Sequence, residues 1–339
     1  MPTATSPSCA PRHGSLNTKP VALTCGEPAG IGPELAPMLW DALKDELSFF
    51  LIGDASHLPE GSPYVEISAP WEAPAAMAQG LPVLPLPMGA PRVAGIPNPA
   101  HAAGVIASIE RGVALVKSGE AGALCTLPIH KKALKDGASF AFPGHTEFLA
   151  HLAGVEHVVM MLASPALRVV PATIHIALAD VPKALTPHSL RRTLEITNAA
   201  LSSQFHIAAP RLAVAGLNPH AGEGGTMGPE EITWIAPLLE ELRRTGLDIA
   251  GPLPADTMFH AAARARYDAA ICMYHDQALI PIKTLDFDRG VNVTLGLPFV
   301  RTSPDHGTAF DIAGQGLANP SSSIEALRLA WAMAKGTAT

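Results

Sequence analysis

Apolar residues recur in two patterns that alternate along this chain. Short apolar runs of roughly four to eight residues, most of them followed by Gly, Pro or His, are typical of strands buried in a parallel sheet. Between them lie longer segments with helical spacing, such as Ile106, Ile109, Val113 and Val116 in 102–117. This alternation predicts an α/β fold with mainly parallel sheets. We expect strands near 21–24, 49–53, 81–84, 123–127, 158–162, 167–174, 212–217, 269–274, 291–297 and 298–302. We expect helices near 34–39, 102–117, 189–205 and 322–335. One further helix should begin at Glu147, and another should contain Ile232, Ile235, Leu239 and Leu242.

Length and composition indicate two domains. The 339 residues, 48% of them hydrophobic, are too many for one compact core. The first nineteen residues are rich in Pro, Ser and Thr and lack the apolar stretch of a signal peptide, so we expect a disordered extension at 1–19. No apolar run approaches the roughly 18 residues that a membrane span needs.

The charge balance excludes some partners and restricts others. A net charge of −7 without any Lys- or Arg-rich run gives no attraction for nucleic acid. An anionic ligand must therefore be held by a few placed cations. The four cysteines (Cys9, Cys25, Cys125 and Cys272) form no CxxC pair, and the last three fall in apolar strands. We interpret them as reduced, buried thiols, which favours a cytoplasmic location.

Three histidines share one kind of position, because His175, His220 and His275 each follow an apolar strand. The carboxyl ends of parallel strands meet at one edge of a sheet. Three imidazoles brought together there could hold a divalent ion and leave positions open for a substrate oxygen. A single histidine in such a place is more often a hydrogen-bonded structural residue, and the three are too far apart in sequence for a zinc finger. The prediction of a metal site therefore depends on whether the fold brings the three histidines together, and not on their spacing in the sequence.

Two glycine-containing turns could bind a ligand or serve only local structure. GEPAGIGPEL (26–35) joins a strand to a helix, either as an anion cradle or as a tight turn that packs helix on sheet. In FPGHTEFL (142–149), Thr146 could cap the following helix, or His145 and Thr146 could hydrogen-bond a ligand.

Charged and polar residues interrupt the apolar strands of 271–316. Lys283, Asn292, Arg301 and Asp305 lie among apolar residues rather than in a polar loop, so we expect them to face a ligand. The next stretch, DHGTAFDIAGQGLANPSSSI (305–324), resembles the adenosine-binding loop of the isocitrate and isopropylmalate dehydrogenase superfamily, which binds NAD without a GxGxxG motif. That resemblance implies a cofactor-binding set of His306, Gly307, Thr308, Ala309 and Asn319.

Motifs spread over nearly the whole chain from about residue 20 carry a family resemblance. GEPAGIGPEL, GHTEF, GLNPHAGEGG, LPADT, MYHDQ, RGVN and GLPFVRTSPDHGTA together resemble the 4-hydroxythreonine-4-phosphate dehydrogenase family of pyridoxal phosphate biosynthesis. The resemblance implies two α/β/α subdomains of the isocitrate/isopropylmalate dehydrogenase kind with the active site in the cleft between them. The first would comprise 20–142 plus 294–339 and carry the cofactor loop. The second, 143–293, would carry the metal and substrate residues and the dimer contacts.

The same resemblance implies a homodimer with active sites shared between subunits and assigns residues to the site. The metal ligands would be His175, His220 and His275, the last from the partner chain. The substrate contacts would be His145, Thr146, Lys283, Asn292 and Arg301.

The implied reaction is metal- and NAD-dependent oxidation of 4-phosphooxy-L-threonine at C3, followed by decarboxylation to 3-amino-2-oxopropyl phosphate. NADP is an alternative cofactor, and zinc, magnesium, manganese and cobalt all suit an open site. The general base would be Asp256, Asp276 or Lys283. Three alternatives stay open: oxidation of another substrate, such as threonate phosphate, erythronate phosphate or a cis-diol; metal-dependent hydrolysis of a phosphorylated substrate; and a regulatory domain that binds metal or nucleotide without catalysis.

Overall fold

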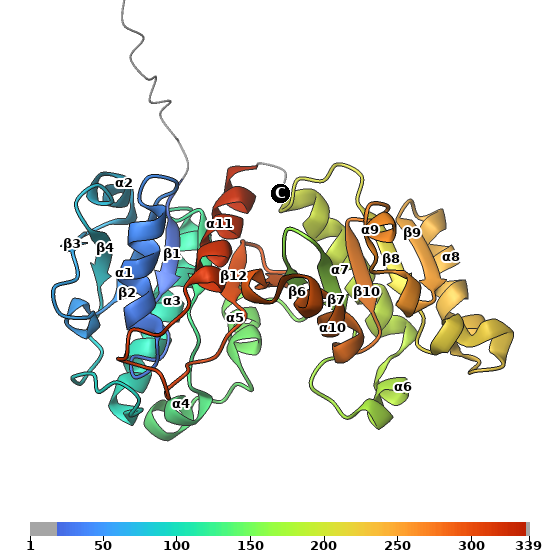
Figure 1. Ribbon diagram of the computed structural model, residues 1–339, viewed down its shortest axis with the longest axis horizontal. Coiled ribbons are helices and arrows are strands. Elements are labelled where there is room, and N and C mark those ends of the chain that lie inside the picture. Colours follow the sequence, from blue (N-terminus) through green and yellow to red (C-terminus); the bar gives the residue numbers. More distant parts are fainter. Residues whose placement is uncertain (1–18, 337–339) are drawn as a thin grey trace, which may run out of the picture.

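The computed structural model describes residues 19–336 and contains a single twelve-stranded sheet covered by helices on both faces (Figure 1). The strand order is β3-β4-β2-β1-β5-β12-β11-β6-β7-β10-β8-β9. Residues 1–18, where the extension was expected, lie outside the described part. The strands are β1 (Val21–Thr24), β2 (Phe49–Gly53), β3 (Tyr64–Glu66), β4 (Leu81–Pro85), β5 (Ala123–Thr126), β6 (Val159–Ala163), β7 (Arg168–Pro171), β8 (Arg211–Ala215), β9 (Asp248–Leu253), β10 (Ala269–Cys272), β11 (Val291–Leu295) and β12 (Arg301–Pro304).

Most strand pairs are parallel, which confirms the predicted fold class, but the centre of the sheet is antiparallel. Strand β11 runs against both β12 and β6, and β6 runs against β7. The reason lies in the connections. Only a short turn joins β6 to β7, and a few residues join β11 to β12, whereas a parallel pair needs a crossover of about a dozen residues or more.

Strands from the two predicted domains occupy the two halves of this sheet. Those from 20–142 and 294–339 form the half around β1, and those from 143–293 form the half around β10 (Figure 1). Strand β11 (Val291–Leu295) spans the proposed boundary at 293/294, so hydrogen bonding continues from one half into the other. The domain division itself stays a prediction.

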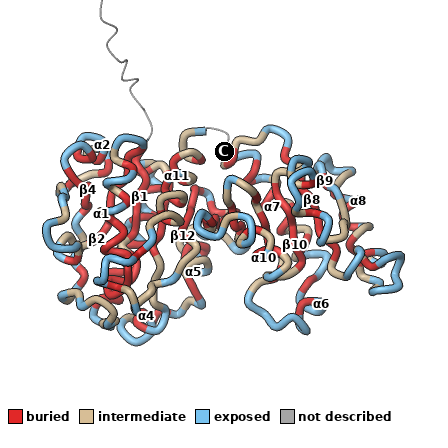
Figure 2. Tube along the Cα trace, in the orientation of Figure 1, coloured by how far each residue is buried: buried red, intermediate tan, exposed pale blue. Residues whose placement is uncertain are grey.

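Alternating side chains of the strands face two helical layers. Val21 and Leu23 belong to the apolar core on one face of the sheet, which also includes residues of α1 and α11 over this half and of α7 and α8 over the other half. Ala22 and Leu124 pack with α3 and α5 on the other face, where α10 covers the second half of the sheet. Figure 2 shows the strands as the buried centre of both halves. The helices are α1 (Gly32–Leu43), α2 (Ala73–Ala76), α3 (Ala102–Ser118), α4 (Lys131–Ala138), α5 (His145–Ala153), α6 (Val181–Ala184), α7 (Pro187–Ser203), α8 (Ala236–Arg244), α9 (Ala261–Arg264), α10 (His275–Asp286) and α11 (Ser321–Lys335).

Several elements were not expected from the sequence, namely strands β3 and β9 and helices α2, α4, α6 and α9, and two further helical segments also differ from expectation. Ile232 was expected to face inward but is exposed, because the segment Glu231–Ile235 forms a π-helical turn, and its wider turn changes which residues face the core. Helix α10, which has Pro281 inside it, was not predicted, and it places Lys283 on a helix. Within residues 19–336, no helix has the length and apolar character to cross a membrane.

The thiols behave as predicted where they can be seen. Cys125 and Cys272 are buried, Cys25 is half-buried, and all three are free. Burial raises the pKa of Cys25 and of Cys125 to about 12, so neither is a nucleophile near neutral pH. Cys9 lies outside the described residues.

Candidate active site

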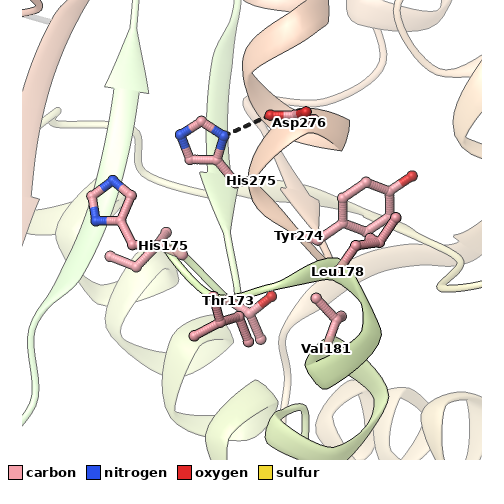
Figure 3. Close-up of a pocket in the computed structure, with 9 residues that line it drawn as sticks. Thr173, His175, Leu178, Val181, Tyr274, His275 and Asp276 are labelled. Atoms are coloured by element: carbon pink, nitrogen blue, oxygen red, sulfur yellow. Dashed lines mark hydrogen bonds and ion pairs between the residues drawn. The ribbon is translucent and has the colours of Figure 1, made fainter.

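A pocket of about 270 Å³ lies where strands β7 and β10 end, and two of the predicted metal histidines line it (Figure 3). The ring centroids of His175 and His275 are 5.6 Å apart. His275 is the first residue of α10, and its Nδ1 lies 2.8 Å from Asp276 Oδ1. That hydrogen bond orients the ring and leaves Nε2 for a ligand. The remaining lining residues are Thr173, Ile174, Ile176, Leu178, Val181 and Tyr274.

The backbone at His175 and His220 is strained. Both residues have a positive φ, 53° and 51°, in the left-handed region that non-glycine residues rarely occupy. His220 lies in the turn η5 (Pro219–Gly225), where φ stays positive from His220 to Gly224. Such conformations cost about 1–3 kcal/mol each and concentrate at functional sites. The strain therefore supports a functional role for both histidines.

One chain brings His175 and His275 together in one pocket, whereas the resemblance implied that His275 would come from the partner chain. His220 is exposed, and no three His, Cys, Asp or Glu side chains within residues 19–336 are grouped closely enough to hold a metal ion. His175, His275 and the Asp276 carboxylate are nitrogen and oxygen donors of the kinds that zinc, manganese and cobalt accept. The pocket thus has suitable donor chemistry but needs further ligands from His220, a substrate or another chain.

Arg301 is a buried cation held by hydroxyl groups. It is 3% exposed, and its guanidinium donates to Thr126 Oγ1 at 3.2 and 2.6 Å and to Thr294 Oγ1 at 2.8 Å. Among the described residues, no carboxylate forms an ion pair with it within 4.0 Å. Burial lowers the pKa of Arg301 to about 10, so the side chain stays charged near neutral pH. A buried cation without a counterion is suited to an anionic ligand.

His145 lies near this cation at the start of α5. Its Nε2 is buried and has no hydrogen-bond partner within the described part. Burial, together with the charges of Arg301 and Lys131, holds the pKa of His145 well below its usual value, so the ring is neutral near pH 7. Gly144 is the N-cap of α5, and no side chain caps the helix. Thr146 therefore does not cap α5, which favours a ligand-binding role for His145 and Thr146.

Lys283 lies beside the cofactor-loop segment. Its Nζ is 2.8 Å from Asp305 Oδ2. The same nitrogen lies over the ring of Phe287, 5.5 Å from the ring centroid. Asn292, on β11, is paired in register with Ser303 on β12, two residues before Asp305. The structure thus brings Lys283 and Asn292 to the end of β12, where the loop that follows begins.

The residues predicted to bind the cofactor have defined local contacts. His306 Nε2 lies 3.0 Å from Ser323 Oγ, the Thr308 carbonyl accepts a hydrogen bond from Ile31 N at 3.0 Å, and Ala309 has φ of 47°. Gly307 is exposed, and no atom lies within 4 Å of the position that a Cβ would take, so a ligand can approach its backbone. Asn319 Oδ1 accepts from Ser321 N at the start of α11.

A carboxylate within the GEPAGIGPEL motif, for which the sequence predicted no role of its own, holds this loop in place. Glu34 is buried in the first turn of α1, and its two oxygens accept hydrogen bonds from Gly314 N and Gly316 N. Arg92 forms an ion pair with Glu34 at 3.7 Å and donates to Pro28 O at 2.7 Å. No spacing rule identifies Glu34 as a contact of the loop, because Gly314 and Gly316 lie 280 or more residues away in sequence.

The GEPAGIG segment is a tight turn rather than an anion cradle. The amide of Ala29 donates to Glu27 Oε1, that of Gly30 to Glu27 O, and that of Ile31 to Thr308 O. These donors are already used, so the turn offers no free set of amides to a phosphate.

Asp256 stands apart from the groups described above. It lies in η7 (Ala255–Thr257), is exposed, and makes no side-chain hydrogen bond or ion pair within the described residues. The structure therefore joins His175 with His275 and Asp276, His145 with Arg301, and Lys283 with Asp305, but leaves His220 and Asp256 outside these groups.

Comparison with known proteins identifies the family to which the chain belongs. The model of the family described as pyridoxal phosphate biosynthetic protein PdxA matches residues 46–330. The 4-hydroxythreonine-4-phosphate dehydrogenase of Ruegeria sp. (strain TM1040) is 66% identical over 315 residues, covering 93% of this chain and 97% of that protein.

Solved structures give the same result. A 4-hydroxythreonine-4-phosphate dehydrogenase from Burkholderia phymatum has 39% sequence identity and a TM-score of 0.82, covering 93% of this chain and 98% of that chain. One from Klebsiella pneumoniae has 36% identity and a TM-score of 0.84, covering 94% of this chain and all of that chain.

Proposed function

The chain belongs to the PdxA family and is an oxidoreductase of the 4-hydroxythreonine-4-phosphate dehydrogenase kind, and from this premise we propose its reaction. The reaction is the metal- and NAD-dependent oxidation of 4-phosphooxy-L-threonine at C3, followed by decarboxylation to 3-amino-2-oxopropyl phosphate, as a step in pyridoxal 5′-phosphate biosynthesis. The observation that carries the proposal is the facing pair of His175 and His275, 5.6 Å apart in a pocket at the strand ends.

The chain's own residues divide into binding and orienting roles. His175, His220 and His275 would hold the divalent ion, and Asp276 orients the His275 ring through the 2.8 Å hydrogen bond. The loop residues His306, Gly307, Thr308, Ala309 and Asn319 would hold NAD. When bound, the metal supplies a Lewis acid for the substrate oxygens, and the nicotinamide accepts the hydride.

Cations and hydrogen-bonding groups would bind the charged ends of the substrate. Arg301 and Lys283 would neutralise its phosphate and carboxylate, with His145, Thr146 and Asn292 as hydrogen-bonding partners. Arg301 supports this assignment because it is buried and charged, and no carboxylate of residues 19–336 forms an ion pair with it. A hydrolase would need the same cations but would have no use for the ordered loop that follows β12.

Three residues are candidates for the general base. Asp276 is engaged with His275, which favours an orienting role for it. Asp256 is exposed and outside the groups that the chain brings together. Lys283 is paired with Asp305 next to the cofactor loop and is assigned above to the anionic groups of the substrate, a role for its charged form, so it is not preferred over the other two as the base.

We further propose a homodimer in which a second copy of the chain completes each active site. Large apolar side chains are exposed in the segments that follow the parallel strands β7, β8 and β10. They lie just after β7, after β8, and along and just beyond helix α10. A second copy covering them would bring another set of donors close to His175 and His275. These exposed residues, named here the strand-end apolar surface, are Ile176, Leu178, Met227, Ile232, Ile280, Leu285 and Phe287. A cytoplasmic location fits the three free thiols.

Replacing His275 tests the proposal directly. His275→Asn should lower NAD reduction with 4-phosphooxy-L-threonine by about a hundredfold or more, because a metal ligand is removed. The assay follows NADH absorbance at saturating metal, and circular dichroism verifies the fold. His188→Asn is the matched control, since His188 also faces another histidine, His157, with ring centroids 6.3 Å apart. Full activity of His275→Asn, or no NADH formation by the unmodified enzyme, would reject the proposal.

A further inference from the structure

Lys131 lies against the first turn of α5, next to the residues proposed to bind substrate. It is the first residue of α4, and α5 begins with His145 after the N-cap Gly144. The Cε and Nζ atoms of Lys131 are both 3.4 Å from the position that a Cβ on Gly144 would occupy. The ammonium group is therefore close to the uncapped amides at the start of α5, where an anion is favoured.

Positive charge gathers at this point without a paired anion. Within the described residues, neither Lys131 nor Arg301 has a carboxylate within 4.0 Å, whereas the neighbouring Lys132 pairs with Asp136. Glu147 Oε2 lies 3.1 Å from the same Cβ position on Gly144, but it is not within ion-pair distance of either cation. Arg301 is buried and Lys131 is exposed, so an anion bound here could contact a buried cation and a solvent-accessible one together.

The imidazole of His145, on which both cations act, also lacks a partner in the described part of the chain. His145 Nε2 is buried and unpaired, and the charges of both Arg301 and Lys131 act on its ring. A buried polar atom without a hydrogen bond is unfavourable unless a ligand supplies one. A phosphate group would satisfy the imidazole, the two cations and the helix amides together.

We propose that Lys131 is a substrate-binding residue that selects phosphorylated over unphosphorylated substrates, its ammonium contacting the phosphate group between Arg301 and the start of α5. This inference rests on the proposed function for the identity of the substrate. The family resemblance had implied substrate contacts from other elements only. Lys131 adds a cation from α4 that the sequence motifs had not assigned to the site.

Steady-state kinetics of a matched pair of variants test the assignment. Lys131→Met should raise KM for 4-phosphooxy-L-threonine about tenfold or more, because a charge-assisted contact to the phosphate is lost, and leave KM for NAD unchanged. Lys132→Met, which removes the neighbouring solvent-facing lysine, should behave as the unmodified enzyme. Lys131→Arg keeps the charge and should restore most of the affinity. An unchanged KM in Lys131→Met would overturn the proposal.

Binding of inorganic phosphate gives a readout that does not depend on turnover. We expect added phosphate to raise the pKa of the His145 imidazole, followed by NMR, in the unmodified protein and in Lys132→Met. In Lys131→Met the phosphate dissociation constant should increase about tenfold or more. If phosphate binds in this way but no NADH forms, the proposed function fails and the Lys131 assignment stands. If phosphate does not act on His145, or binds Lys131→Met equally well, the assignment fails.

Discussion

Two threonines in register on neighbouring strands differ in hydrogen bonding, because one hydroxyl has a partner and the other has none within residues 19–336. Thr126 on β5 accepts two hydrogen bonds from Arg301, whereas the hydroxyl of Thr24, its register partner on β1, is buried without a partner. Thr126→Val should lower the free energy of unfolding by about 1–3 kcal/mol, because the guanidinium donors lose their acceptor. Urea denaturation measures the change.

Thr24→Val is the control, since it removes the same hydroxyl at the same level of the sheet. We expect it to leave the free energy of unfolding unchanged or to increase it, because no hydrogen bond is lost and a polar group leaves the core. Equal destabilisation by both variants would show that Thr126 matters for packing alone.

At the scale of residues, the sequence predicted which side chains belong to the candidate site better than it predicted which residues they contact. His175, His275 and Arg301 were predicted from their position after or within apolar strands, and the structure gives them a shared pocket or a buried environment. Glu34, although it lies in GEPAGIGPEL, and Lys131 were given no role, because the residues that each contacts are brought near only by the fold. Their roles depend on side-chain positions that no short spacing encodes.

Among the elements, the loop between β12 and α11 depends on α1. Glu34→Gln keeps the side-chain shape but leaves one amide oxygen to serve both Gly314 N and Gly316 N, and it removes the ion pair with Arg92. We expect KM for NAD to rise several-fold with little change in KM for the phosphorylated substrate. NADH fluorescence titration measures the binding directly.

Glu46→Gln provides the comparison on a carboxylate of the surface. Glu46 pairs with Arg328 at 2.8 Å, but both side chains are largely exposed, and such pairs contribute only about 0–1 kcal/mol. This variant should bind NADH normally. If Glu34→Gln also binds NADH normally, the carboxylate serves the stability of the fold and not the cofactor loop.

The helices and strands themselves followed the hydrophobic pattern closely, with β1, β2 and α3 at or within a residue of their predicted bounds. The pattern failed where local rules were broken. Pro281 concealed α10, and the π-helical turn at Glu231–Ile235 turned Ile232 outward. Periodicity also says nothing of strand direction, so the antiparallel centre of the sheet came only from the structure.

For the whole molecule, the strand-end apolar surface predicts self-association. Ile280→Asp and Leu178→Asp place a charge among exposed apolar side chains of that surface and should shift the protein from dimer toward monomer, because burying the carboxylate is unfavourable. Analytical ultracentrifugation measures the shift. Activity should fall in parallel if the two copies complete each other's sites.

Trp71→Asp serves as the reference, since Trp71 is also highly exposed but lies in the other half of the sheet, in the 3-10 turn Pro70–Glu72. It should leave both association and activity unchanged. A monomeric unmodified protein with full activity would refute the shared site.

The place of β12 has a consequence for how the chain is made. Strand β12 and helix α11 come late in the sequence, yet β12 pairs with β5, and α11 packs in the same core as β1 and α1. During synthesis, the amino-terminal half therefore emerges from the ribosome with the edge of β5 open and part of its apolar face uncovered. Such an edge invites pairing with other chains. A nascent chain stalled before Arg301 should consequently bind chaperones or aggregate, and release from this state should come only when the last helix is free to dock.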